Sequence, residues 1–193
     1  MIQQIAFGTT LCLAIYFIWK RVLDIRNNID LGKNNALNDN VGKRLANMVL
    51  VAFGQKKMFK RFIPAFFHFF IYAGFLVINI EVLEFVIDGL AGTHRIFAPY
   101  LGGFYNVLMN VFEFLAIAVL LACIVMLIRR NVLKIKRFHS AEMSGWPKLD
   151  ANIILVTEII LMCAIVIMNG ADQVLQKTDA GFTSTGFLFF SGQ

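Results

Sequence analysis

The amino-acid sequence predicts an all-α integral membrane protein with four transmembrane helices in a bundle. Its composition is strongly apolar, with 59% hydrophobic and 16% charged residues among 193, and its mean hydropathy is +0.71. Soluble domains have about half apolar and about a quarter charged residues. The apolar residues are also gathered into four runs of 18 to 28 residues, and a helix needs roughly 20 to cross the hydrocarbon of a bilayer.

The predicted spans form a single membrane domain over residues 1–193. They cover residues 2–19, 63–90, 105–128 and 151–168. The pairs Lys20-Arg21 and Arg129-Arg130 end the first and third spans, and Pro64 suits the first turn of the second. The last segment, residues 182–193, becomes apolar again and resembles the start of a fifth span.

The positive charges lie on one side of this predicted arrangement. Two connecting loops, residues 20–62 and 129–150, hold sixteen of the eighteen Lys and Arg residues, while the other two connections hold only Arg95 and Lys177. Basic loops beside membrane spans remain in the cytoplasm. Both basic loops are therefore predicted to be cytoplasmic, with the N-terminus outside. The net charge of +6 indicates topology, and no nucleic acid is expected as a partner.

The second span carries a histidine, His68, about 7 Å inside its inner edge by the helix rise. An ionisable side chain at membrane depth is a functional candidate by default. One interpretation is an axial ligand of haem b iron or a hydrogen-bond donor to a quinone. The alternative is a structural histidine bonded to a neighbouring helix. His94 and His139 lie in loops, so no second histidine is placed at a similar depth.

The three cysteines, Cys12, Cys123 and Cys163, stand singly inside apolar stretches. Iron–sulfur clusters, zinc sites and disulfide frameworks need cysteines in characteristic spacings or pairs. The sequence therefore predicts no cluster within this chain and no metal site apart from a haem iron at His68. The three cysteines are expected to be buried apolar side chains.

The acidic residue predicted to lie deepest in the membrane is Glu158, roughly 12 Å into the fourth span by the helix rise. A charge at the centre of a span costs about 2.5–3.5 kcal/mol on insertion scales. Glu158 is therefore expected either to be protonated and hydrogen-bonded or to line a quinone or proton pocket. Together with Glu113 of the third span, it is a candidate proton-handling residue.

Three further acids, Glu81, Glu84 and Asp88, share one face of the second span by their i, i+3, i+7 spacing. This face falls near the outer interface, where we expect a solvated or paired rim; a proton path is the alternative. Glu113 belongs to a polar stripe that begins at Asn106 in the third span. This stripe is predicted to pack against the acidic face of the second span.

Several runs together resemble a known family. QKKMFKR (residues 55–61), PAFFH (64–68) and YAGF (72–75) are similar to the membrane domain of heterodisulfide-reductase-like (Fe–S)-binding oxidoreductases. The N-terminal domain of those proteins is similar to the haem-b-binding gamma subunit of respiratory nitrate reductase. The runs over residues 79–99, 128–138 and 145–152 resemble the Bacteroidetes-type form.

This resemblance implies a membrane electron-transfer module in a bacterial inner membrane, with a periplasmic N-terminus. Family members pass electrons between cytoplasmic iron–sulfur clusters, haem b and menaquinone, and some accept electrons from electron-transfer flavoprotein. His68 matches a family haem-ligand position. Other protein subunits, or a C-terminal Fe–S domain, are expected to supply the second ligand and the clusters. The chain would then be an oxidoreductase component that is not catalytic alone, and no catalytic residue is assigned.

Two other functions compete with this one. A non-redox anchor or scaffold subunit of a larger membrane complex would need no histidine ligand. A small ion- or proton-coupled transporter would use Glu158 and Glu113, but the internal repeats and broken helices typical of transporters are not visible in the sequence.

Overall fold

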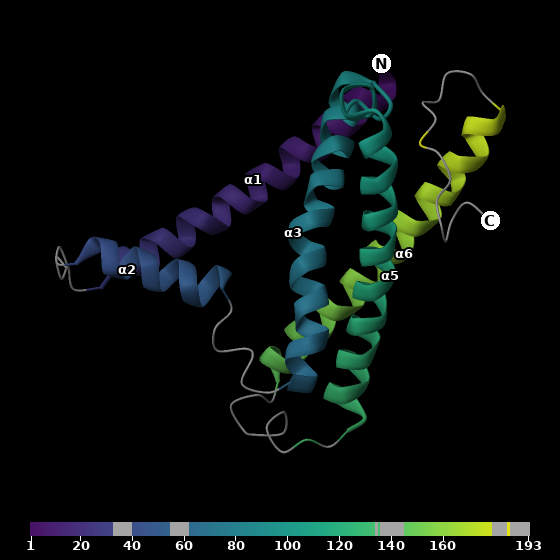
Figure 1. The fold of residues 1–193 in the computed structure, drawn as a ribbon. Coiled ribbons are helices and arrows are strands. Elements are labelled where there is room, and N and C mark those ends of the chain that lie inside the picture. The colour runs from purple at the N-terminus through teal and green to yellow at the C-terminus, as the bar shows by residue number, and fades with distance from the viewer. Residues whose placement is uncertain (33–39, 55–61, 134, 136–144, 179–184, 186–193) are drawn as a thin grey trace. The chain divides into compact units, whose positions relative to one another are not determined.

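The computed structural model describes residues 1–32, 40–54, 62–133, 135, 145–178 and 185. Four helices in this part of the chain are long and apolar enough to cross a membrane. They are α1 (Ile2–Asp30), α3 (Phe62–Ala91), α5 (Gly103–Asn131) and α6 (Trp146–Thr178) (Figure 1). The predicted all-α membrane fold with four spans is confirmed, and the apolar helices fit contact with a lipid bilayer. The proposed start of a fifth span lies outside the described residues, Thr185 excepted.

Two of the helices, α1 and α6, continue well beyond their predicted apolar spans. The residues of α1 after Lys20 were predicted as loop, yet the helix runs on to Asp30. Ion pairs one turn apart, Arg21–Asp24 at 3.8 Å and Arg26–Asp30 at 3.9 Å, accompany this polar end. Such pairs add about 0.2–0.5 kcal/mol each to a helix. The apolar run therefore marks the predicted membrane part of α1 and not the end of the helix.

The chain divides into two compact units, the first made of residues 1–60 and 87–93. It contains α1, α2 (Val41–Met48), the π-helix η1 (Val49–Phe53) and the end of α3. A Cβ on Gly89 would lie 2.8 Å from the Phe7 ring, so the beginning of α1 packs directly on the end of α3. These two helix ends therefore lie together within the first unit.

The second unit contains residues 61–86 and 94–193, with most of α3, the short α4 (Ala98–Leu101), α5 and α6. Its apolar core joins three helices, because α5 packs against both α3 and α6. The buried core residues are Ile78 of α3, Leu115, Ala116, Val119 and Cys123 of α5, and Met162 and Ile165 of α6.

Polar contacts close the far end of α5 against the beginning of α6. The side-chain amides of Asn131 and Asn152 donate to each other's oxygens at 3.2 and 3.0 Å. Arg130 also donates to the backbone carbonyl of Pro147 at 3.1 Å. These bonds hold the two helices together beside the predicted cytoplasmic loop.

The helices α3 and α5 approach each other closely at Gly74. A Cβ on Gly74 would lie 2.3 Å from Cγ2 of Val119, a distance that real Cβ atoms do not reach. Small residues at such positions let membrane helices pack closely. Because valine is β-branched and stiff at χ1, the Val119 side chain cannot turn away without a rearrangement of the core.

We predict that Gly74→Ala destabilises the protein by about 1–3 kcal/mol, the usual range for overpacking of a close contact. Unfolding in lipid bicelles would measure the change. Gly103→Ala is the matched control, since nothing lies within 4 Å of a Cβ at that position. The double variant Gly74→Ala/Val119→Ala should recover part of the loss, and strictly additive effects would contradict the proposed contact.

Candidate functional site

The second unit buries a positive charge in the connection between α3 and α4. Arg95 is 3% exposed, and its backbone lies in the left-handed region, with φ of 55°. This conformation costs about 1–3 kcal/mol for a residue other than glycine. A buried cation also needs charged or polar partners, because its transfer out of water is otherwise very unfavourable. The contacts of Arg95 therefore have to compensate both effects.

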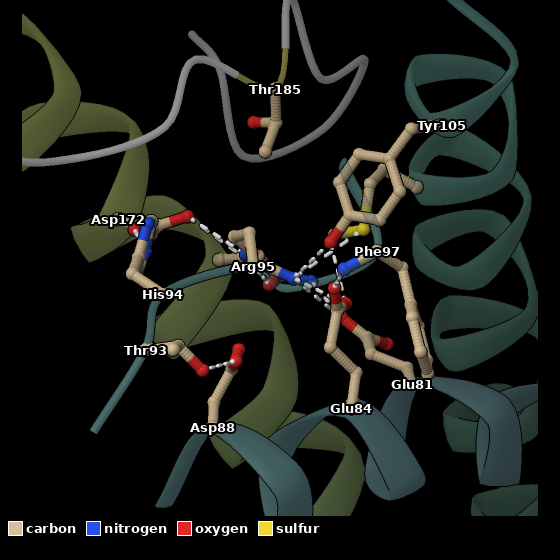
Figure 2. A network of polar contacts seen from close by, with 12 residues as sticks. Glu81, Glu84, Asp88, Thr93, His94, Arg95, Phe97, Tyr105, Asp172 and Thr185 are labelled. Atoms are coloured by element: carbon tan, nitrogen blue, oxygen red, sulfur yellow. Dashed lines mark hydrogen bonds and ion pairs between the residues drawn. The ribbon is translucent and has the colours of Figure 1, made fainter. Parts of the chain in front are cut away.

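Two helices supply the main partners of Arg95 (Figure 2). From α6, Asp172 accepts hydrogen bonds from Nε at 3.3 Å and Nη2 at 3.1 Å, and Asn169 accepts one from Nη2 at 2.8 Å. From α3, Glu81 and Glu84 form ion pairs with Nη1 at 3.6 and 4.0 Å. One guanidinium therefore connects α3 to α6.

A third helix, α5, contributes Tyr105 and Met109. The Tyr105 hydroxyl donates to Oε2 of Glu84 at 2.5 Å. Arg95 Nη1 lies 3.5 Å from the Tyr105 oxygen and 3.4 Å from the Met109 sulfur. The backbone N–H of Phe97 donates to the other oxygen of Glu84 at 2.9 Å. Both oxygens of Glu84 are thus hydrogen-bonded.

The partly accessible edge of the site is formed by His94. Its Nε2 lies 2.7 Å from Oδ1 of Asp172, and the two side chains are 30% and 10% exposed. Gln176 donates to Oδ2 of the same aspartate at 2.9 Å. We call the connected residues the Arg95 network; its members are Glu81, Glu84, His94, Arg95, Tyr105, Met109, Asn169, Asp172 and Gln176.

The charge of Arg95 is secure in this setting. Burial by itself lowers the pKa of the guanidinium, but attraction to neighbouring acidic groups, Asp172 among them, outweighs it and leaves the pKa above its ordinary value. The network therefore always contains at least one positive charge, and it draws its carboxylates from two different helices.

The structure corrects one expectation about the acidic face of α3. Glu81 and Glu84 are 0% and 1% exposed, so the solvated-rim interpretation is wrong, while pairing is what the structure shows. Helical spacing predicts which residues share a face of α3, but it does not predict what packs against that face. In the structure, the loop that carries Arg95 covers it. Asp88 differs from these two, because it is partly exposed and accepts a hydrogen bond from Thr93 at 2.6 Å. Glu113 is fully buried on α5, four residues after Met109.

His68 lies apart from the Arg95 network, near the beginning of α3. It is partly exposed and makes no hydrogen bond to any residue that the structure describes. Nearby, an apolar groove of about 260 Å³ runs between α3 and α5, but His68 does not line it. The groove is lined by Phe66, Phe67, Phe70, Phe114, Ile117, Ala118, Leu121 and Ala122.

The described residues fit only half of a bis-histidine haem site. His94 follows the opposite end of α3 and is bonded to Asp172, and His139 lies outside the described residues. Within the described part of the chain, no group of three His, Cys, Asp or Glu side chains is placed to hold a metal ion. The described residues therefore place no second histidine ligand beside His68, the candidate predicted from the sequence.

Glu158 is partly buried on α6 and forms no hydrogen bond or ion pair with the described residues. In the stripe on α5, the Asn110 side chain donates to the backbone carbonyl of Asn106 on its own helix. The cysteines differ in burial: Cys123 is buried and Cys163 partly buried, but Cys12 is exposed. Cys12 lies on α1, in which no residue is buried.

Sequence reasoning missed the centre of the site. Arg95 was counted only as a topology signal, and Asp172 and Asn169 lie beyond the predicted end of the fourth span. One signal was present, since Arg95 is the single Lys or Arg in its connection and follows an acidic helix face. No protein-family model, curated protein or solved structure matches this chain.

We predict that Arg95→Met lowers the free energy of unfolding by about 3–5 kcal/mol, because it leaves several buried carboxylates without their cation. Denaturant unfolding of the reconstituted protein measures this loss. Lys177→Met is the matched control, since Lys177 is exposed at the end of α6. Equal effects of the two substitutions would show that the Arg95 network does not stabilise the fold.

Proposed function

We propose that this chain is the membrane module of a menaquinone-linked iron–sulfur oxidoreductase. The observation that carries the proposal is His68, in a segment that resembles the haem-binding membrane domain of that family and lies on the apolar helix α3. The chain would hold haem b or menaquinone in the bilayer, beside iron–sulfur clusters on the cytoplasmic side. Electron-transfer flavoprotein is one electron donor that the resemblance implies.

In this proposal the chain's own contribution is limited to binding and orientation. His68 would supply one ligand to haem b iron or one hydrogen bond to menaquinone, and α3 would fix its depth in the membrane. Haem b, when bound, would supply one-electron redox chemistry. The second ligand and the iron–sulfur clusters would come from another subunit or domain, because the described residues place no second histidine near His68.

A non-redox anchor or scaffold is the second candidate function. It is supported by the Arg95 network, whose described contacts are made with other residues of the same unit and join three helices. A stable helical unit of this kind is compatible with either function, a membrane anchor or an electron-transfer module. The two functions differ in what His68 does.

The test is a reduced-minus-oxidised haem b spectrum, with an assay of menaquinone-dependent electron transfer, on the membrane complex purified with its natural subunits. We expect both signals in the wild type, and we expect His68→Ala to abolish them while the complex still assembles. Phe69→Leu is the matched control, at an exposed neighbouring position. An assembled His68→Ala complex that keeps both signals would favour the anchor, and a wild type with neither would remove the redox proposal.

We further propose that the N-terminus is periplasmic in a bacterial inner membrane, as the one-sided basic charge indicates. Single cysteines at Tyr100, 83% exposed, and Val132, 68% exposed, would report the two sides after the three native cysteines are replaced by alanine. We expect a membrane-impermeant maleimide added to intact spheroplasts to label Tyr100→Cys and not Val132→Cys. The reverse labelling pattern would show that the topology is opposite to the one proposed.

A further inference from the structure

The Arg95 network contains more carboxylates than positive charges. Glu81, Glu84 and Asp172 all lie in contact with the guanidinium of Arg95. The other group that can become cationic is His94, through its bond to Asp172. Even when His94 carries a proton, two positive charges face three carboxylates, and α5 adds the buried Glu113.

No other basic side chain is present on this side of the predicted topology to correct the imbalance. Residues 91–104 and 169–193 contain no Lys or Arg besides Arg95 and Lys177, and Lys177 is exposed. An uncompensated carboxylate in a buried site is very unfavourable, and the usual outcome is that the group becomes neutral by taking up a proton.

The hydrogen bonds identify which carboxylate is uncompensated. Glu84 receives donors on both oxygens, from Phe97 and Tyr105. Both oxygens of Asp172 also have partners: Oδ1 contacts Nε2 of His94, and Oδ2 accepts hydrogen bonds from Arg95 and Gln176. These are the environments that stabilise an ionised carboxylate.

Glu81 is different. Its Oε1 accepts a bond from Asn169 at 3.3 Å and lies 3.6 Å from Arg95. Its Oε2 is buried and has no hydrogen-bond partner among the described residues, although the whole side chain is 0% exposed. An ionised carboxylate would leave this oxygen unsolvated, whereas a proton on it neutralises the surplus charge.

We propose that Glu81 is a proton-binding site, occupied in the resting protein by one proton on Oε2. Occupation takes one proton from the aqueous phase, forms one O–H bond and transfers no electron. The groups that set its occupancy are Arg95 and His94 of the connection, Glu84 of α3, Tyr105 and Glu113 of α5, and Asp172 of α6. The site is independent of His68, so it does not depend on the proposed redox function.

Infrared spectroscopy of the full-length protein in lipid membranes tests this proposal directly. A protonated carboxyl group has a carbonyl stretch that is separate from the bands of ionised carboxylates and shifts in D2O. We expect the difference spectrum of wild type minus Glu81→Gln to contain this band at neutral pH. Asp88→Asn is the matched control, as a partly exposed acid of the same helix, and it should leave the band in place.

Thermal unfolding provides a second, independent measurement. Glutamine has the shape of a protonated glutamate, so Glu81→Gln should leave the unfolding midpoint unchanged or raise it. Glu84→Gln should lower the midpoint, because one of the two donors on Glu84 loses its acceptor. A Glu81→Gln difference spectrum without the carbonyl band would overturn the proposal, since it would mean that Glu81 is ionised. A large fall in its midpoint would do the same.

Discussion

The burial of one guanidinium organises the end of the second unit where α5 begins. Arg95 is held in a left-handed backbone conformation and is removed from water, and both features are unfavourable by themselves. They persist because α3, α5 and α6 each direct polar side chains at the same point. None of these side chains could be buried alone, so the three helices and the connecting loop depend on one another.

Close apolar packing and a second polar contact complete this unit. Gly74 and Val119 let α3 and α5 approach in the middle of their lengths, and the Asn131–Asn152 amide pair joins α5 to α6 at the opposite end. In lipid, helices gain little from hydrophobic burial against one another, so close packing and interhelical hydrogen bonds determine how they associate. The Arg95 network and the Asn131–Asn152 amide pair supply interhelical hydrogen bonds, and the Gly74–Val119 contact supplies close packing. The three contacts lie at different positions along the helices.

The two proposed activities lie at different levels of the same helix. His68 and Glu81 are separated along α3 by roughly 20 Å at the helix rise of 1.5 Å per residue. The proposed redox ligand is near the predicted cytoplasmic face, where clusters would lie, and the proposed proton site is near the opposite face. The core of unit two, which contains Ile78 and Val119, occupies the membrane depth between them.

The sequence alone determined the features that depend on composition and local order. Four apolar runs predicted four membrane helices, because the length of an apolar helix follows from transfer between water and lipid. The topology that the arrangement of Lys and Arg indicates stays a prediction. The sequence also predicted that Glu81 and Glu84 share a helix face, which follows from the helical repeat alone. Tertiary structure decided what that face meets. Arg95, Tyr105 and Asp172 are distant in sequence and come together only when three helices and a loop pack, and neither hydropathy nor periodicity contains that information.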